Sequence, residues 1–113
     1  MNNHQLYPEA TKEISEMRTA LAPEIAGAWR NFSKAVFTEG ALPEKTKQLI
    51  AVAVAHVTQC PYCIRGHTAQ AMRKGASKQE IMEAIWVAAE MRAGGSYAHS
   101  ALALDEMKSA KEG

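Results

Sequence analysis

Two cysteines and a histidine lie close together in this chain, and all three side chains can do chemistry. Cys60 and Cys63 are the only cysteines among 113 residues, and His67 follows four positions after the second. Pro61 is typical of the first turn of a helix, which places Cys60 at or beside the helix N-cap. Side chains three and four positions apart share a helical face, so thiol, thiol and imidazole would line one side of that helix. Such thiols can approach to disulfide distance, and the helix N-terminus and the imidazole can stabilise a thiolate.

Three interpretations of this motif stay open. In a redox dithiol, one thiolate attacks a peroxide or a disulfide, and the other cysteine then closes an intramolecular disulfide. In a zinc site, the motif supplies three ligands where a structural site needs four, and His56 or His99 could supply the fourth. In a packing motif, the cysteines only fill the core. The redox dithiol is the favoured interpretation, because C-x-x-C at a helix start has the geometry that this chemistry requires.

Length, composition and charge narrow the classes of protein that the chain can belong to. A chain of 113 residues fits a single domain with one modest core, and much of its 47% apolar content is alanine, which buries little area. We therefore expect helical faces to be buried against other copies in a homo-oligomer. The net charge of +1, without a basic stripe, gives nucleic-acid binding no support. The sequence has no membrane-length apolar run and no secretory signal pattern, so we expect a cytoplasmic protein that does not bind membranes.

Helical periodicity and the positions of glycine and proline predict an all-α chain without strands. The apolar run Leu49–Ala55 has no polar side, so we expect its helix to be central and fully enclosed. Ser77 and Glu80 form a capping-box pattern, and Gly94-Gly95 should either interrupt the helix that follows or allow very close helix contact. The five to six expected helices cover about residues 9–21, 23–39, 43–57, 61–75, 77–93 and 96–109.

Several motifs together resemble the carboxymuconolactone decarboxylase family, specifically its alkylhydroperoxidase AhpD-like core. The resemblance runs from about residue 43 to 104 of a single domain that spans residues 1–113. It implies an all-helical fold built round a helical hairpin and assembled as trimers or hexamers, of which we expect the hexamer. The matching segments are Lys47–Ala55, Cys60-x-x-Cys63-x-x-x-His67, Gly75-Ala76-Ser77, Glu80-Ile81 and Met91–Gly95 with His99.

The resemblance also implies an activity and a role for each residue of the motif. It implies a peroxidase or disulfide reductase in which Cys63 attacks the hydroperoxide, Cys60 resolves, and His67 helps to deprotonate Cys63. The redox-active disulfide takes the place of a cofactor, and no metal is implied. Electrons would come from a dithiol donor such as a lipoylated or thioredoxin-like protein.

One position departs from the family pattern. The family has a glutamate twelve residues before the first cysteine, and Gln48 stands there in this chain. An amide cannot take up or hold a proton as a carboxylate does, so the proton relay behind the histidine must be altered. Gln48 could still orient a water, and Glu44, His56 and His99 are the other candidates for the relay. Tyr62, inside the motif, could shape access of the substrate.

Two rival functions remain beside the thiol chemistry. A lactone enzyme of the decarboxylase branch would use His67 and a polar pocket, but it has no evident need for two activated thiols. A non-catalytic zinc or interaction module would bind metal or a partner and would not react with peroxide.

Overall fold

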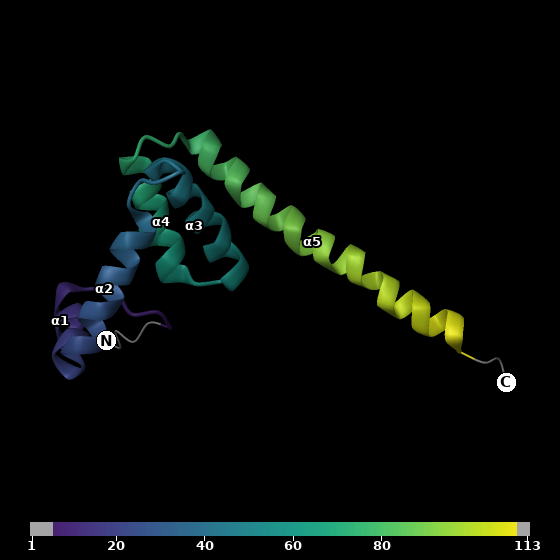
Figure 1. Ribbon diagram of the computed structural model, residues 1–113, viewed down its shortest axis with the longest axis horizontal. Helices are drawn as coiled ribbons and strands as arrows, with labels where there is room; N and C mark the ends of the chain where they lie inside the picture. Colours follow the sequence, from purple (N-terminus) through teal and green to yellow (C-terminus); the bar gives the residue numbers. More distant parts are fainter. Residues whose placement is uncertain (1–5, 111–113) are drawn as a thin grey trace.

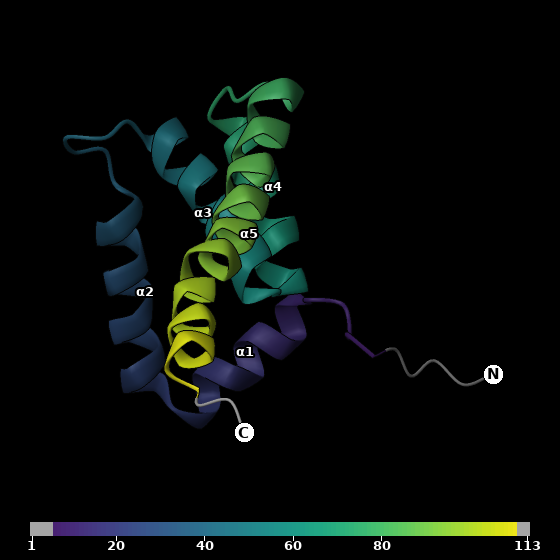
Figure 2. The same cartoon turned by 90° about the vertical axis from the view of Figure 1, so that its right-hand side faces the viewer.

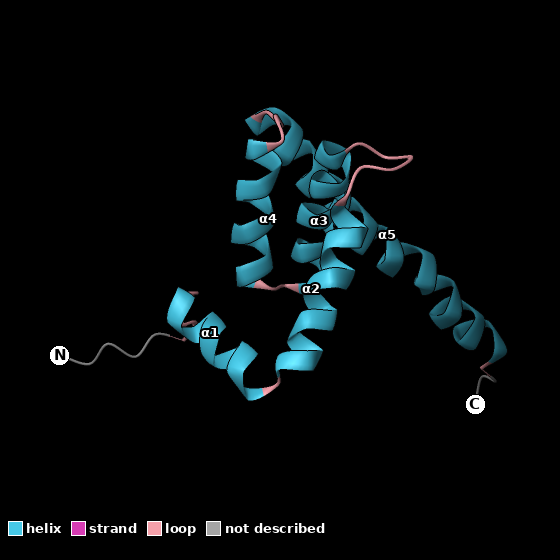
Figure 3. Cartoon of the chain, turned by 60° about the vertical axis from the view of Figure 1, so that its left-hand side comes forward, coloured by secondary structure: helices cyan, strands magenta, loops and turns pink. Residues whose placement is uncertain are grey.

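The computed structural model describes residues 6–110 and folds into helices and loops, without a strand in that range (Figure 3). The all-α class predicted from the sequence is therefore confirmed. The chain order is α1 (Lys12–Leu21), α2 (Pro23–Phe37), α3 (Glu44–Thr58), α4 (Pro61–Arg73) and α5 (Lys78–Ser109).

Helix α2 ends two residues earlier than the sequence predicted. Its last residue is Phe37, where Glu39 was expected. The hydroxyl of Thr38 donates a hydrogen bond of 2.7 Å to the carbonyl of Lys34, and Thr38 itself has extended backbone angles. The backbone N–H of Thr38 binds the same carbonyl at 3.0 Å, and the extended backbone of Thr38 ends the helix there.

Helices α3 and α4 form the helical hairpin that the family resemblance implies. Only Gln59 and Cys60 connect them, and Gln59 adopts the left-handed conformation with a φ of 59°. Its backbone N–H donates to the carbonyl of Ala55 and closes the last turn of α3. A connection this short forces α4 to return beside α3 (Figure 1).

Helix α4 ends in a turn that requires glycine. Gly75 has a φ of +93°, its N–H donates to the carbonyl of Met72 at 3.0 Å, and the N–H of Ala76 donates to Ala71 at 2.9 Å. This is the hydrogen-bond pattern of a Schellman motif, in which a side chain at Gly75 would be strained. The turn directs the chain into α5.

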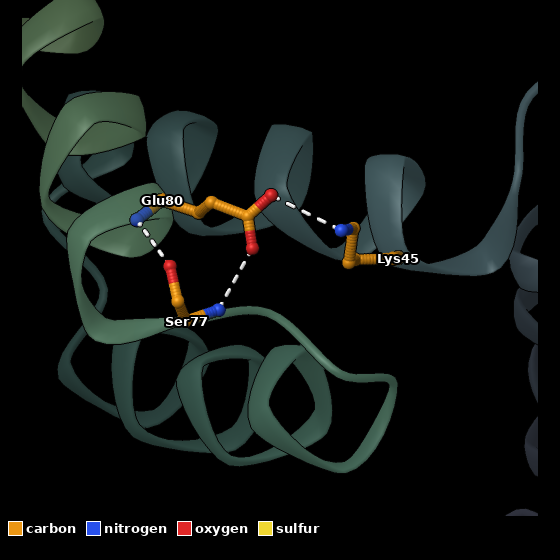
Figure 4. Close-up of polar contacts among 3 residues, drawn as sticks. All are labelled: Lys45, Ser77 and Glu80. Atoms are coloured by element: carbon orange, nitrogen blue, oxygen red, sulfur yellow. Dashed lines mark hydrogen bonds and ion pairs between the residues drawn. The ribbon is translucent and has the colours of Figure 1, made fainter.

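The predicted capping box starts α5 (Figure 4). The Ser77 hydroxyl accepts from the Glu80 N–H at 3.0 Å, and the Glu80 carboxylate accepts from the Ser77 N–H at 2.8 Å. The other oxygen of Glu80 accepts from Lys45 Nζ at 3.0 Å, which ties the start of α5 to α3. The helix then continues without a break through Gly94-Gly95, so the predicted sixth helix is the second half of α5. Neither glycine makes a close helix contact within the chain.

The core is small and lies between α3, α4 and α5. Four of its six buried apolar side chains are alanines, in keeping with the composition. The expectation that α3 is fully enclosed is wrong for the single chain. Ile50, Val54 and Val57 are all more than 40% exposed, because α4 and α5 cover only one side of α3. The buried residues are Val52, Ala55, Ala71, Ala76, Ile81 and Ala88.

The chain is far from compact. Its radius of gyration is 19.9 Å and its extents are 64 × 38 × 35 Å, whereas a compact domain of this length has a radius of gyration of about 13 Å. Helices α1 and α2 stand to one side of the α3–α4 hairpin, and the second half of α5 projects away from the other helices (Figures 1 and 2). Within the described residues, no helix is long and apolar enough to cross a membrane.

Candidate functional site

The two cysteines lie at the start of α4, where the sequence placed them. Cys60 is the N-cap, and its sulfur accepts a hydrogen bond from the backbone N–H of Cys63 at 3.3 Å. Both thiols are free and partly exposed. Serine and aspartate oxygens usually satisfy the first N–H groups of a helix, so a sulfur in this role gains most when it carries negative charge.

The surroundings shift the pKa values of the two thiols in opposite directions. A hydrogen bond from the Cys63 side chain, reinforced by the Cys63 N–H, lowers the pKa of Cys60 below the ordinary value of 9.0. Donating that hydrogen bond to Cys60, together with partial burial, raises the pKa of Cys63. These opposite directions make Cys60 the more acidic thiol of the pair. The family resemblance gives the attacking role to Cys63 instead, and the order of attack stays a prediction.

His67 lies one turn beyond Cys63 and is held on two sides. Its Nδ1 is 2.8 Å from Oε1 of Gln48, which is the one buried polar side chain among the described residues. Phe37 from the end of α2 stacks on the imidazole, with ring centroids 5.0 Å apart and an angle of 28° between the planes. Since an amide oxygen can only accept, Nδ1 carries the hydrogen, and Nε2 is left free to take a proton.

Lys47 holds Phe37 in place. Its ammonium group donates to the carbonyl of Val36 at 2.8 Å and to that of Thr38 at 2.6 Å, the residues on either side of Phe37. These carbonyls belong to the end of α2, where a cation is favourable and the helix leaves acceptors free. Two adjacent residues of α3 therefore position His67. Gln48 binds the imidazole directly, and Lys47 binds the segment that carries Phe37. Neither the role of Phe37 nor that of Lys47 was predicted from the sequence.

The other relay candidates do not reach His67 within the chain. The Nδ1 of His56 forms a hydrogen bond of 2.7 Å with the carbonyl of Val52 in its own helix, which is the bond of a structural histidine. Glu44 pairs with Lys74 of α4 at 2.9 Å. His99 is exposed on the half of α5 that projects away from the other helices (Figure 1). Of the four candidates, only Gln48 is in contact with the imidazole.

An open cavity of about 700 Å³ lies between the N-terminal segment and the first turns of α4, and neither cysteine lines it. Tyr62 forms one wall, and its hydroxyl donates to the carbonyl of Pro8 at 2.6 Å while its ring packs edge-on against Tyr7. The N-terminal segment therefore packs on the motif at Tyr62, and the role of Tyr62 in substrate access stays a prediction. The cavity is lined by Tyr7, Pro8, Glu9, Ala10, Pro61, Tyr62, Arg65 and Gly66.

The motif supplies the groups that thiol–disulfide exchange uses, namely two thiols, one of which has a lowered pKa, and an imidazole one turn further along the helix. In the part of the chain that the structure describes, no three His, Cys, Asp or Glu side chains come together as a metal site.

The described residues form five helices, and a C-x-x-C pair lies at the start of α4, the second helix of the hairpin. These features are those of a small all-helical protein with two neighbouring thiols. The sequence model of the carboxymuconolactone decarboxylase family matches residues 23–106. The chain belongs to this family.

Relatives and solved structures cover most of the chain. "Uncharacterized protein 4 in cox locus" of Paracoccus denitrificans is 59% identical over 97 residues, which is 86% of each chain. An uncharacterized protein of Cupriavidus necator is 37% identical over 72% of this chain and 74% of its own. A crystal structure from Methanobacterium thermoautotrophicum has a TM-score of 0.70 and 37% identity, and it covers 74% of this chain and 93% of its own. A family member from Legionella pneumophila, solved in its apo form, has a TM-score of 0.67 and 34% identity over 84% of this chain and 88% of its own.

Proposed function

We propose that the protein is a thiol oxidoreductase that reduces hydroperoxides, or the disulfide of a partner, with the Cys60–Cys63 pair. The opposite pKa shifts of the two cysteines, which follow from the hydrogen bonds at the start of α4, carry this proposal. They make Cys60 the more acidic thiol and place a second thiol within hydrogen-bond reach of it.

The first step uses the thiolate of Cys60. Its sulfur attacks the terminal oxygen of a hydroperoxide, an S–O bond forms, and the O–O bond breaks. The sulfur becomes a sulfenic acid and is oxidised by two electrons, while the peroxide is reduced to an alkoxide that takes one proton from solvent to leave as the alcohol. The N–H of Cys63, which binds the Cys60 sulfur, keeps the thiolate oriented.

The second step needs a base, because Cys63 starts as a thiol. His67 lies one turn away on the same face of α4 and receives that proton on Nε2, since Nδ1 is bound to Gln48. The Cys63 sulfur then attacks the Cys60 sulfur, the S–S bond forms, and hydroxide leaves with the proton from His67 as water. The result is a Cys60–Cys63 disulfide.

The disulfide must be reduced again before a second turnover. A dithiol donor, such as a lipoylated or thioredoxin-like protein, supplies two electrons and two protons by exchange through a mixed disulfide. The partial exposure of both cysteines leaves the bond open to such a donor.

Reaction of the reduced protein with a small alkyl hydroperoxide tests this function. We expect loss of both thiols together with formation of one alcohol, and a Cys60–Cys63 disulfide in the peptide map. Neither Cys60→Ser nor Cys63→Ser should turn over with dihydrolipoamide as donor, whereas His56→Gln, outside the site, should keep its activity. Full turnover by the protein with both cysteines replaced would refute the proposal.

The family name also raises the lactone reaction as a second candidate. Such an enzyme would use His67, its Gln48 partner and a pocket for the lactone, without a thiol. Lactone turnover that survives loss of both cysteines would be its signature. The two cysteines, with their opposite pKa shifts, would then have no role, and for this reason we favour the thiol reaction.

We also propose that the protein works as a homo-oligomer, a trimer or a hexamer, with the hexamer favoured. The large radius of gyration and the exposed aliphatic and aromatic side chains support it, because a chain this short with so small a core is marginal alone.

A further inference from the structure

The second half of α5, residues 96–109, has no partner within the chain. We call it the C-terminal arm. Every residue of the arm is exposed, and Tyr97 and Leu104 keep 83% and 60% of their surface accessible. Before the arm begins, Arg92 of α5 donates a hydrogen bond of 3.3 Å to the carbonyl of Val57 in α3. A helix with this much exposed apolar surface is stable in water only when another surface covers it.

One side of the arm combines an apolar stripe with charged residues near its end. Tyr97, Ala101 and Leu104 follow the spacing of residues that share a helical face, Lys108 continues that spacing, and Asp105 lies beside Ala101. Asp105, Glu106 and the C-terminus of the helix together outweigh the charge of Lys108, so this end of the arm is negative. A suitable partner surface is therefore apolar in its middle and positive at one edge.

The groove between α1 and α2 is such a surface. It has a volume of about 570 Å³, and Ile25 and Trp29 in it are 74% and 65% exposed. Two arginines and no carboxylate line it, and Arg30 is fixed by a hydrogen bond of 3.1 Å to Thr19. We call it the α1–α2 groove, and its lining residues are Ser15, Arg18, Thr19, Ala22, Ile25, Ala26, Trp29 and Arg30.

The arm cannot fill the groove of its own chain. Helix α5 has 32 residues and packs on α3 and, through fewer residues, on α4, with no packing against α1 or α2. Figure 1 shows the arm and the α1–α2 pair at opposite ends of the molecule. The arm is about 21 Å long and α2 about 22 Å, at 1.5 Å per residue, so the lengths match.

We propose that the C-terminal arm of one copy docks in the α1–α2 groove of a second copy. Tyr97, Ala101 and Leu104 lie against Ile25 and Trp29 of the other copy, and Asp105 faces the arginines at the edge of the groove. The proposal rests on the self-association proposed above and is independent of the thiol chemistry.

A charge swap tests the docking, with oligomer mass measured against concentration by light scattering. Arg18→Glu and Asp105→Arg should each weaken association, by roughly tenfold in Kd, since each places like charges together. The double variant in one chain should restore part of the association, because the new basic group at position 105 then meets the new acidic group at position 18, while Arg30 keeps its charge. Lys78→Glu, at the other end of α5, is the control and should leave the mass unchanged.

Cross-linking tests which surfaces touch. Chains with Cys60→Ser and Cys63→Ser are given one new cysteine each, Ala26→Cys in the groove or Ala101→Cys on the arm. The mixed chains should form a disulfide between copies on mild oxidation, because docked surfaces bring the two Cβ atoms within bonding range. Ala103→Cys, on the opposite side of the arm, should not form it.

The outcomes separate the two levels of the proposal. A wild-type protein that is monomeric at all concentrations overturns self-association and docking together. An oligomer that the charge variants leave intact, and that cross-links only through two arms or not at all, overturns the docking alone. Partly restored association in the double variant together with the groove-to-arm disulfide supports it.

Discussion

The Nδ1 of His67 lies 2.8 Å from Oε1 of Gln48, on the neighbouring helix of the hairpin. The acceptor is a neutral amide at the position where the family has a carboxylate. It fixes the tautomer of the imidazole but adds no charge that would hold a proton on the ring. In the proposed mechanism the histidine accepts the proton of Cys63 and releases it again within one reaction cycle.

Replacement of Gln48 should slow disulfide closure without preventing the first attack. In Gln48→Leu the buried Nδ1–H loses its acceptor, which costs about 1–3 kcal/mol of folding free energy. The ring is no longer oriented, so we expect closure to slow roughly tenfold, equivalent to about 1.4 kcal/mol. Acid quenching and alkylation after a peroxide pulse measure the closure rate. Gln79→Leu, on the exposed start of α5, is the matched control.

Gln48→Glu should change the dependence of closure on pH. A carboxylate next to Nδ1 favours the charged imidazolium, so a higher pH is needed before the ring is neutral and can accept a proton. The acidic limb of the pH–rate profile should therefore move to higher pH. An unchanged profile would mean that His67 does not take the proton of Cys63.

Lys47 should affect the rate of disulfide closure because it positions Phe37 against His67. In Lys47→Met the carbonyls of Val36 and Thr38 lose their donor, and the end of α2 that carries Phe37 is released from the imidazole. We expect the closure rate to fall about threefold or more, because an aromatic pair contributes about 0.5–1.5 kcal/mol. Lys45→Met also removes a lysine bridge from α3, but toward α5. Equal closure rates in the two variants would argue against a positioning role of Lys47.

The two thiols should titrate in separate steps. The ultraviolet absorbance of the reduced protein should show one thiolate forming below pH 9.0 and a second above it, since the pKa of Cys60 is lowered and that of Cys63 is raised. Cys63→Ala removes the largest cause of the lowering, so the remaining step should move up toward 9.0. Cys60→Ala should move the step of Cys63 down. A single step at the same pH in both variants would show that the thiols do not interact.

The capping box should make stability depend on pH in the acid range. Hydrogen bonds from Ser77 and Lys45 lower the pKa of Glu80 below its ordinary value of 4.5. A carboxyl group whose pKa is lower in the folded state adds stability at pH values above 4.5, and this stability is lost as the pH falls through the lowered pKa. Glu80→Gln should be less stable than the wild type at pH 7 in urea unfolding, and the difference should shrink on acidification. A difference that stays constant with pH would rule out the ionised carboxylate as its source.

Local sequence signals predicted much of this structure. The proline after Cys60, the serine and glutamate before α5 and Gly75 after α4 act through hydrogen bonds within a few residues, and each lies where it was expected. The helix break expected at Gly94-Gly95 does not occur. Each glycine lowers the stability of a helix by only about 1 kcal/mol relative to alanine, which a long helix tolerates.

The contacts around His67 could not be predicted in the same way. Phe37 and Lys47 reach the site because α2 turns back on α3, and no spacing rule relates residues on either side of that loop. Glu44 and His56 were reasonable relay candidates by position, but Lys74 and the carbonyl of Val52 bind them instead. Only the neighbouring helices decide which polar side chain faces the imidazole.

In the proposed mechanism Cys60 attacks the hydroperoxide and Cys63 resolves. Trapping of sulfenic acid with dimedone after a hydroperoxide pulse, followed by peptide mass mapping, tests this order directly. We expect a dimedone adduct on Cys60 in the Cys63→Ser protein and no adduct in the Cys60→Ser protein. An adduct on Cys63 in Cys60→Ser, with Cys63→Ser unreactive, would reverse the two roles. No adduct in either protein would contradict the thiol chemistry itself.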